Sequence, residues 1–253
     1  MSEPEPELPE GFRKLPPADQ QQIRAAGAAI GHFAFRRTRA VMIGPGPGMR
    51  GSLRNGSLFV LTIGGRYYLV TARHVLEEWR SRSRSGEAVV FQVGSATLDP
   101  GSSLAWESAS ADIAMLTLTK DELAEMDIEP CEATLGWPPP TPRLDEYVFV
   151  CGFPGYRREL LSVERLDFTS LGFLARVTGV DHGSFTIQFE RDHWITTGSH
   201  MPPPGVELGG MSGGPAFLLG TLAYPVVGVV SEHSAGFELM RISMLAAFPG
   251  RSD

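Results

Sequence analysis

Three residues of this sequence carry the side chains that nucleophilic catalysis requires: His74, Asp112 and Ser212. A serine hydroxyl is a poor nucleophile at neutral pH and needs an adjacent base to take its proton. Histidine can be that base, and an aspartate on its far ring nitrogen fixes the tautomer and stabilises the imidazolium that forms. These residue types predict an acyl-transfer site at which Ser212 attacks, His74 moves the proton and Asp112 orients His74.

Each of the three residues also has a simpler interpretation when it is taken alone. His74 ends the strand-like run VTARHV, Asp112 opens the apolar run IAMLTL, and Ser212 lies in the turn LGGMSGGPAF. A structural histidine, a capping aspartate and a plain glycine turn would explain them separately. Their combination favours catalysis, because glycines around a serine let backbone N–H groups turn inward and hold the oxyanion of a tetrahedral intermediate.

The elements that must position these residues are predicted to be β-strands. Short runs rich in β-branched and aromatic residues recur along the chain and are separated by turn residues. They cover residues 57–63, 67–72, 87–93, 113–118, 146–153, 172–180, 184–190, 214–219 and 224–232. Gly64 and Gly65 join the first two runs and predict a hairpin. Many short strands with little helix between them predict an all-β sandwich or barrel.

The chain divides into four segments. Residues 1–16 are acidic and proline-rich and are predicted to be disordered. Residues 17–126 hold a helix that opens at Pro17, a first β lobe and a helical turn near its end. Residues 127–146 contain five prolines and read as a connector, and residues 147–253 form a second β lobe and a C-terminal tail. The basic run RSRSRS, from Arg80 to Ser85, is predicted to be a solvated loop after a helix.

Composition excludes several classes of function. A net charge of −7 and a pI near 5.4 leave no basic surplus for binding nucleic acid. No apolar run approaches the roughly 20 residues that cross a bilayer, and the acidic start MSEPEPELPE is not a secretory signal. Two cysteines, Cys131 and Cys151, favour free thiols in a reducing compartment over a single bridge. The histidines lack metal-ligand spacing. We therefore expect a cytoplasmic protein without metal or cofactor.

Taken together, the three motifs resemble those of the chymotrypsin-like serine peptidases, which include trypsin-like and HtrA-like branches, and especially their bacterial intracellular type. TARHV is similar to the family's TAxH histidine motif, ADIAMLTL to its D-I-A-x-L motif, and GMSGGPAF to its G-x-S-G-G-P motif. The order His, Asp, Ser also fits. The resemblance covers about residues 40–245. It implies two antiparallel six-stranded β-barrels with the active site in the cleft between them, and it leaves the N-terminal helix unexplained.

The resemblance also implies supporting roles for other residues. The backbone N–H groups of Gly210 and Ser212 match the oxyanion hole. The stretch GVVSEHS resembles the strand that lines the substrate pocket, which implicates Ser231, Glu232 and His233. Within that strand, Ser231 matches a position whose hydroxyl supports the triad aspartate, and His233 stands where the family often has glycine and is expected to narrow the pocket.

Two positions depart from the family pattern. Met211 replaces the aspartate that, in secreted members, receives a newly cut N-terminus during activation, so that mechanism is expected to be absent. Val206 matches the pocket floor, where a trypsin-type preference for Arg or Lys needs a carboxylate. Glu207 beside it keeps that preference open.

These features predict a cofactor-free serine endopeptidase that hydrolyses peptide bonds through an acyl-enzyme. Its partners are expected to be a protein or peptide substrate, with a regulatory protein partner left open, and neither nucleic acid nor a membrane. One alternative is a catalytically silent protease-fold module that binds a peptide by strand addition. A serine esterase with the same machinery is the other.

Overall fold

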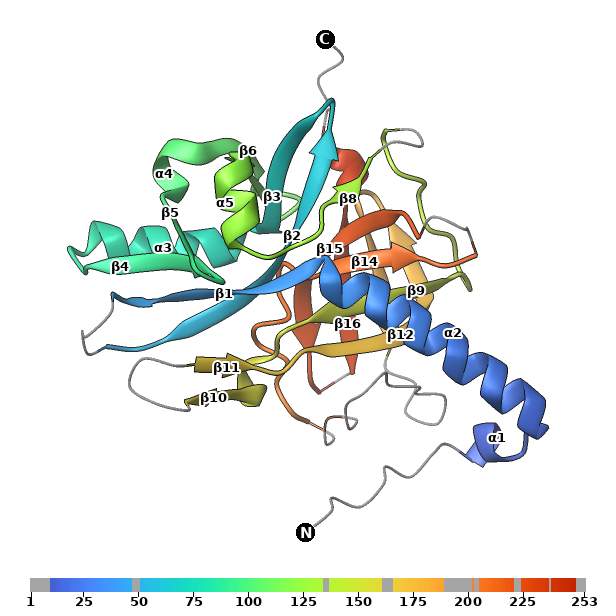
Figure 1. The fold of residues 1–253 in the computed structure, drawn as a ribbon. Coiled ribbons are helices and arrows are strands. Elements are labelled where there is room, and N and C mark those ends of the chain that lie inside the picture. Colours follow the sequence, from blue (N-terminus) through green and yellow to red (C-terminus); the bar gives the residue numbers. More distant parts are fainter. Residues whose placement is uncertain are drawn as a thin grey trace.

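A computed structural model of the chain describes residues 10–46, 51–133, 137–160, 166–188, 202, 205–220, 224–236 and 238–248 (Figure 1). Its helices are α1 (Glu10–Arg13), α2 (Pro17–Arg36), α3 (Arg73–Arg84), α4 (Pro100–Ser103) and α5 (Lys120–Glu125), with 3₁₀ segments η1 (Gly155–Arg157) and η3 (Leu245–Ala247). The first lobe contains strands β1 (Thr38–Pro45), β2 (Arg54–Ile63), β3 (Arg66–Ala72), β4 (Val89–Val93), β5 (Ala96–Leu98), β6 (Leu104–Ser108), β7 (Ile113–Leu118) and β8 (Cys131–Glu132). The second contains β9 (Tyr147–Gly152), β10 (Arg158–Leu160), β11 (Leu166–Phe168), β12 (Leu171–Asp181), β13 (Ser184–Gln188), β14 (Pro215–Leu218), β15 (Val226–Ser234) and β16 (Leu239–Met244).

The chain folds into two β lobes preceded by a helix, as the sequence predicts. In the second lobe, strands β12-β13-β16-β15-β14-β9 close into a six-stranded barrel, and β10 and β11 form a separate hairpin. In the first lobe, the described strands form one eight-stranded sheet in the order β5-β4-β1-β2-β3-β7-β6, and β8 pairs in parallel with β2. The first lobe therefore has more strands than the six expected, because the short β5 joins one edge of the sheet and the short β8 pairs with β2.

The hairpin predicted around Gly64 and Gly65 is confirmed. Strands β2 and β3 pair antiparallel with Ile63 opposite Arg66. Both glycines have positive φ, 56° and 74°, which is the left-handed conformation that a tight hairpin turn requires. Strand β3 of this hairpin ends at Ala72, two residues before His74.

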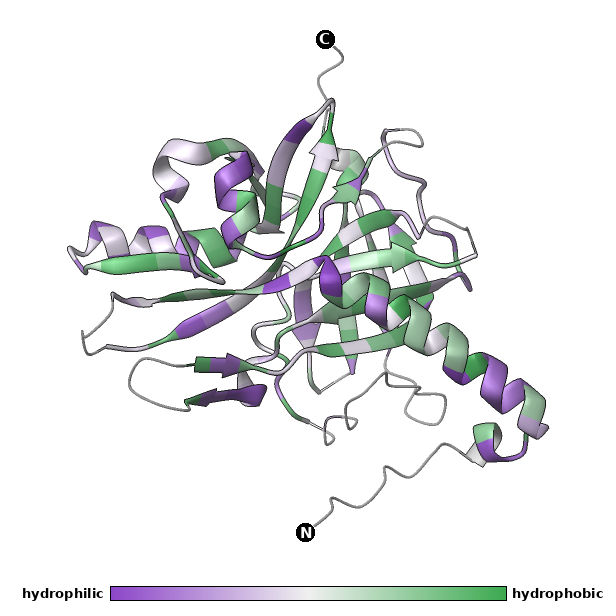
Figure 2. Ribbon diagram, in the orientation of Figure 1, coloured by the Kyte–Doolittle hydropathy of each residue, from purple (hydrophilic) through white to green (hydrophobic). Residues whose placement is uncertain are grey.

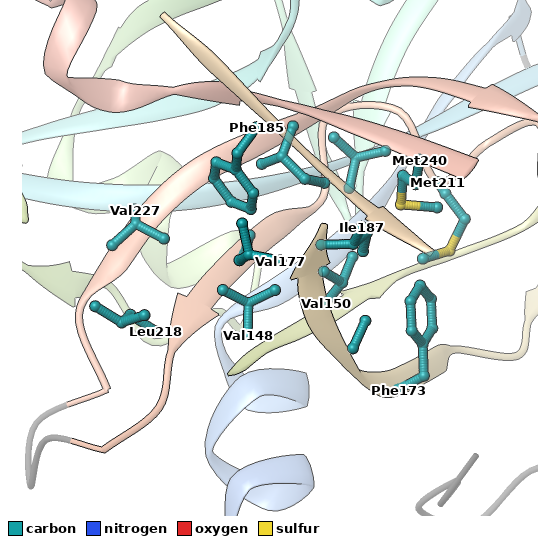
Figure 3. Packing of buried hydrophobic residues seen from close by; sticks show 14 of the residues in the cluster. Val148, Val150, Phe173, Val177, Phe185, Ile187, Met211, Leu218, Val227 and Met240 are labelled. Carbon is teal, nitrogen blue, oxygen red and sulfur yellow. The ribbon is translucent and has the colours of Figure 1, made fainter. Parts of the chain in front are cut away.

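Three apolar clusters hold the lobes together. One fills the barrel of the second lobe, where Val150, Phe173 and Met240 contribute (Figure 3), and one fills the first lobe. The third cluster lies between the lobes and includes residues of both, among them Phe59 and Phe217, together with Ile30 from α2. Figure 2 shows the corresponding hydrophobic stretches along the strands of both lobes. Because this third cluster is shared, the lobes and α2 form one packed unit.

Helix α2 begins at Pro17, as predicted, and only its C-terminal part is buried. Ile30 and Ala34 are buried, and the Phe33 ring packs edge-on against Phe217 with ring centroids 5.4 Å apart. The Thr38 hydroxyl then donates to the Ala34 carbonyl at 2.9 Å. The first turns of α2 are largely exposed and extend away from the lobes (Figure 1).

Two segments differ from the sequence-based expectation. Residues 10–13, inside the segment expected to be disordered, form α1, whereas residues 1–9 lie outside the described residues. The basic run that starts at Arg80 is not a loop but the end of α3, up to Arg84. Within it, Arg82 is 9% exposed, donates to the Ile43 carbonyl at 3.2 Å and pairs with Glu87. An arginine stem can pack on apolar surface while its head group finds polar partners, and a basic run does not reveal that burial.

Within the described part of the chain, no helix has both the length and the apolar character needed to cross a bilayer.

The packing of α2 leads to a stability prediction. Ile30→Ala should lower the free energy of unfolding by about 2–5 kcal/mol, because it leaves a cavity in the cluster between the lobes. Gln22→Ala, on the exposed part of the same helix, should change it by less than about 0.5 kcal/mol. Urea unfolding followed by tryptophan fluorescence measures both. Equal effects would show that the helix does not contribute to the common core.

Candidate active site

His74 and Asp112 are brought together by two neighbouring strands of the first lobe. β3 pairs antiparallel with β7, with Ala72 opposite Ile113. The residues that follow β3 therefore lie near Asp112, which precedes β7. The His74 Nδ1 atom lies 2.7 Å from one Asp112 carboxylate oxygen, and the His74 backbone N–H donates to the other oxygen at 2.9 Å. The Asp112 carbonyl accepts from the Arg73 N–H at 2.9 Å. Asp112 thus binds both the side chain and the backbone around His74.

This geometry selects one form of the imidazole. With a carboxylate at Nδ1, the proton of neutral His74 belongs on Nδ1, which leaves Nε2 as the basic nitrogen. The His74 side chain is 50% exposed and that of Asp112 is 27% exposed. Asp112 also has a φ of +51°, a conformation that aspartate tolerates better than most residues. The bond to Asp112 therefore fixes the Nδ1 side of the His74 ring, and the other side of the pair is open to solvent.

Hydrogen bonds to its backbone carbonyl groups hold the turn around Ser212 in place. The four carbonyls of residues 209–212 each accept a hydrogen bond. In chain order, the donors are Gly155 N at 2.6 Å, Ser57 Oγ at 2.7 Å, Gly214 N at 2.9 Å and Ser57 N at 2.8 Å. The first lobe supplies two of these donors and the second lobe supplies the other two. The conformation of the turn is therefore fixed from both sides.

The half-buried Gly210 and Ser212 N–H groups have no partner among the described residues, and neither does the N–H of the exposed Gly209. Met211 N donates to Leu208 O at 3.0 Å and Gly213 N to Val230 O at 2.8 Å, but Gly210 N and Ser212 N donate to no described residue. In a trans peptide the N–H points opposite to the C=O, so these two donors face away from the groups that hold the turn. N–H groups that are buried without any partner are rare in folded proteins, whereas those that solvent reaches can bond to water. A pair of them beside a half-buried serine is the arrangement that an oxyanion hole needs.

Met211 holds the turn through its side chain. It is fully buried in the barrel core, among residues that include Val150, Phe173 and Met240 (Figure 3). A thioether fills irregular apolar space well. The residue before Ser212, which the sequence marks as a departure from the family pattern, is thus held by apolar packing and cannot form an ion pair.

Gly213 places the turn directly on the first lobe. A Cβ at this position would lie 2.0 Å from the Ser57 carbonyl oxygen, 2.3 Å from Thr71 Oγ1 and 3.0 Å from Ala72 N. The turn therefore meets β2 and the end of β3 two residues before His74. No hydrogen bond joins Ser212 to His74 within the part of the chain that the structure describes. Catalytic hydrogen bonds are often long in unliganded enzymes and shorten when substrate binds.

The residues expected to line the substrate pocket lie on two adjacent segments. The Leu208 N–H donates to His233 Nδ1 at 3.4 Å, and the same nitrogen lies 4.0 Å from a carboxylate oxygen of Glu207. This places Val206, which is half-buried, and Glu207, whose side chain is 80% exposed, beside strand β15. Burial lowers the pKa of His233, while Glu207 and Glu238 oppose that shift. A neutral His233 keeps Nδ1 able to accept the Leu208 bond.

The other two expected pocket residues follow a bulge in β15. The pairing of β15 with β16 shifts between Val230 and Glu232. There the Ser231 hydroxyl donates to the Arg241 carbonyl at 3.1 Å, so in this structure it does not support Asp112. Glu232 is exposed and lies opposite Arg241. The strand register is thus compatible with a pocket wall, but the expected contact between Ser231 and Asp112 is absent from the described residues.

Sequence reasoning missed the residues that hold the Ser212 turn from outside. Ser57 is fully buried in β2 and supplies two of the four donors. Thr71, also fully buried, donates to the Ser57 carbonyl at 2.8 Å, and Gly155 supplies a third donor to the turn. The only signal in the sequence was a polar residue at the start of an otherwise apolar strand, in NGSLFVL.

The cysteines do not compete with Ser212 for the role of nucleophile. Cys131 and Cys151 are free and buried. Burial raises the pKa of each thiol to about 12, so neither forms a thiolate near neutral pH. Nor does the described part of the chain gather three or more His, Cys, Asp or Glu residues in a group that could hold a metal ion.

Comparisons with known proteins give structural likenesses only. No protein-family model matches the chain, and no curated protein does. The Rv3671c protease from M. tuberculosis in its active form is similar over 94% of this chain and 84% of its own, with 18% identity and a TM-score of 0.48. The serine protease AL20 from an extremophilic microorganism is similar over 83% and 91%, with 14% identity and a TM-score of 0.46. An inactivated protease paralogue of the scabies mite is similar over 85% and 91%, with 16% identity and a TM-score of 0.48. The chemistry of this chain must be argued from its own residues.

The close approach at Gly213 can be tested by adding one carbon. Gly213→Ala should destabilise the protein by several kcal/mol, because φ is +90° and the new Cβ would overlap backbone of the first lobe. Gly209→Ala is the matched control in the same turn, since a Cβ there meets nothing within 4 Å. Thermal unfolding of both variants measures the difference. Equal stability would contradict the packing of the turn against β2 and β3.

Proposed function

We propose that this chain is a serine-type endopeptidase that hydrolyses peptide bonds through an acyl-enzyme. The observation that carries the proposal is the pair of unpaired N–H groups at Gly210 and Ser212, in a turn whose four carbonyls are all bonded. The pairing of His74 with Asp112 beside the same turn supports it further. Together they provide a nucleophile, a base and a site for negative charge.

The proposed reaction begins when Ser212 Oγ attacks the carbonyl carbon of a bound peptide and passes its proton to His74 Nε2. The carbonyl oxygen becomes negative and binds the Gly210 and Ser212 N–H groups. As the intermediate collapses, His74 donates the proton to the leaving amine, and an ester to Ser212 remains. A water molecule then gives a proton to His74 and attacks the ester carbonyl. As this second intermediate collapses, His74 returns the proton to Ser212 Oγ, and the acid is released.

Asp112 stays ionised throughout this cycle. Its bond to Nδ1 keeps Nε2 directed outward, and its charge stabilises the imidazolium that forms twice in each turnover. Its second bond, to the His74 backbone N–H, fixes the start of α3 relative to the carboxylate. Asp112 therefore orients both the ring and the backbone that carries it.

A catalytically silent peptide-binding module is the second candidate, and the missing Ser212–His74 hydrogen bond is the observation that favours it. A serine esterase would use the same groups, and only the shape of the cleft would separate it from a peptidase. Both alternatives give results different from those of a peptidase in the experiment below.

Substitutions in the triad test the proposal. Ser212→Ala and His74→Ala should each remove nearly all cleavage of fluorescein-labelled casein, and the double variant should be hardly worse, because the groups act as a unit. Asp112→Asn should lower kcat by about 10³–10⁴-fold, because it favours the wrong tautomer. The full-length protein is used, with its N-terminus verified by mass spectrometry, and a fluorophosphonate probe reports the nucleophile.

The controls separate the three candidates. Wild type that labels and cleaves casein is a peptidase, whereas wild type that labels but cleaves only p-nitrophenyl esters is an esterase. Wild type that labels no better than Ser212→Ala would contradict both enzymes and leave the binding module. Labelling that needs prior removal of the N-terminal residues would contradict the expectation drawn from Met211.

Specificity gives a second prediction. Val206 at the expected pocket floor should favour small or medium apolar side chains at P1, which is measured by cleavage of a peptide library. Val206→Asp should shift the preference toward Arg and Lys by at least about tenfold, because a carboxylate there would pair with the basic side chain. Glu207→Gln should change little, since the Glu207 side chain is largely exposed. A basic preference in wild type that Glu207→Gln abolishes would show that Glu207 reaches the pocket.

A further inference from the structure

Ser57 is a fully buried serine of β2 whose hydroxyl contacts two separate segments of the second lobe. It donates to the Gly210 carbonyl at 2.7 Å and accepts from the Phe153 N–H at 2.8 Å. A hydroxyl has one proton to give, and an N–H can only donate. The single Ser57 proton is therefore committed to the Gly210 carbonyl.

These two bonds link the backbone segments that set the direction of the Gly210 N–H. That N–H shares a peptide with the Gly209 carbonyl, which accepts from Gly155 N at 2.6 Å. Gly155 lies two residues after Phe153, and the Phe153 N–H is bonded to Ser57. The next peptide of the turn begins with the Gly210 carbonyl, which is also bonded to Ser57. One hydroxyl thus fixes the segment that holds Gly209 and the carbonyl of Gly210 itself.

Gly210 itself holds this point of the turn less firmly than a residue with a side chain would. Gly210 has a φ of +98° and no side chain that could hold its conformation. Without the hydroxyl, the Gly210 carbonyl and the Phe153 N–H would both lose a partner in a buried setting. Rotation of the peptides on either side of Gly210 would recover hydrogen bonds with water or neighbouring groups, and it would turn the Gly210 N–H away from the substrate.

We propose that Ser57 is a positioning residue that holds the Gly210 N–H in the orientation needed to bind the oxyanion. The inference rests on the proposed function and adds to it a residue from the opposite lobe. Asn55 assists from the same strand, since its side-chain amide donates to the Phe153 carbonyl at 2.7 Å. Ser57 itself does not touch the substrate. It acts through Gly210.

Ser57→Ala tests the inference on p-nitrophenyl acetate hydrolysis. Both the acylation rate and the steady-state kcat should fall by about 10–100-fold, because both steps pass through an oxyanion, and KM should change by less than about threefold. Loss of an oxyanion donor typically costs about 10²–10³-fold, and a donor that is only misaligned should cost less. The rate of fluorophosphonate labelling should fall in parallel with kcat.

Thr38→Val is the matched control. Thr38 is also fully buried in the first lobe, and its hydroxyl contacts Cys151 of the second lobe at 3.0 Å but no residue of the Ser212 turn. Its loss should lower the melting temperature by an amount similar to that for Ser57→Ala and leave kcat within about twofold of wild type. A structural role for Ser57 would make the two variants alike in both measurements.

Ser57→Cys keeps the test decisive if the alanine variant does not fold. A thiol of similar size is a weaker hydrogen-bond donor than a hydroxyl. If Ser57→Ala folds, the kcat of Ser57→Cys should lie between those of wild type and Ser57→Ala. If Ser57→Ala does not fold, the kcat of Ser57→Cys should lie below that of wild type. Three results would each overturn the role of Ser57. They are a wild-type kcat in either Ser57 variant, a change in KM alone, and an equal fall in kcat for Thr38→Val. If wild type neither hydrolyses the ester nor reacts with the probe, the proposed function fails first, and that result is distinct from the others.

Discussion

The backbone of the Ser212 turn can lie against the first lobe only because residue 213 has no side chain. At Gly213, a single added carbon would overlap the Ser57 carbonyl and the Thr71 hydroxyl. Its φ of +90° is also a conformation that residues with side chains rarely adopt. This contact brings the second-lobe turn to the end of β3, two residues before His74 in the first turn of α3. The bonds from Ser57 to the turn depend on this contact.

The turn is held by different forces on its two sides. On the first-lobe side, hydrogen bonds from Ser57 hold its carbonyls. On the barrel side, Met211 is buried in the apolar core. Neither side needs an ion pair at residue 211, which is consistent with a turn that forms during folding and does not wait for a cut N-terminus. The donors left without described partners include the two that the proposed chemistry uses, the Gly210 and Ser212 N–H groups.

Local patterns predicted much of this structure because they depend on near neighbours in sequence. The Gly64–Gly65 hairpin and the helix from Pro17 follow from turn chemistry and a proline at the first helical position, and strand periodicity predicted a sandwich or a barrel, while the two barrels were expected from the family resemblance. The extra first-lobe strands did not follow from such patterns, since β5 and β8 are too short to show a period, and β8 forms by pairing with the distant strand β2. Ser231 was misjudged for another reason. A bulge in β15 directs its hydroxyl to β16, and a bulge leaves little trace in sequence.

The proposed triad was found through its motifs, but the residues that hold it could not be. Ser57 lies 96 residues from Phe153 and 153 residues from Gly210, so no local pattern joins them. This long-range contact has a consequence for how the site would respond to movement between the lobes. His74 and Asp112 both belong to the first lobe and would stay paired if the lobes separated. The Gly210 and Ser212 carbonyls would lose Ser57 together, and both unpaired N–H groups would lose their fixed direction. Separation of the lobes would therefore disturb the proposed oxyanion site more directly than the pairing of His74 with Asp112.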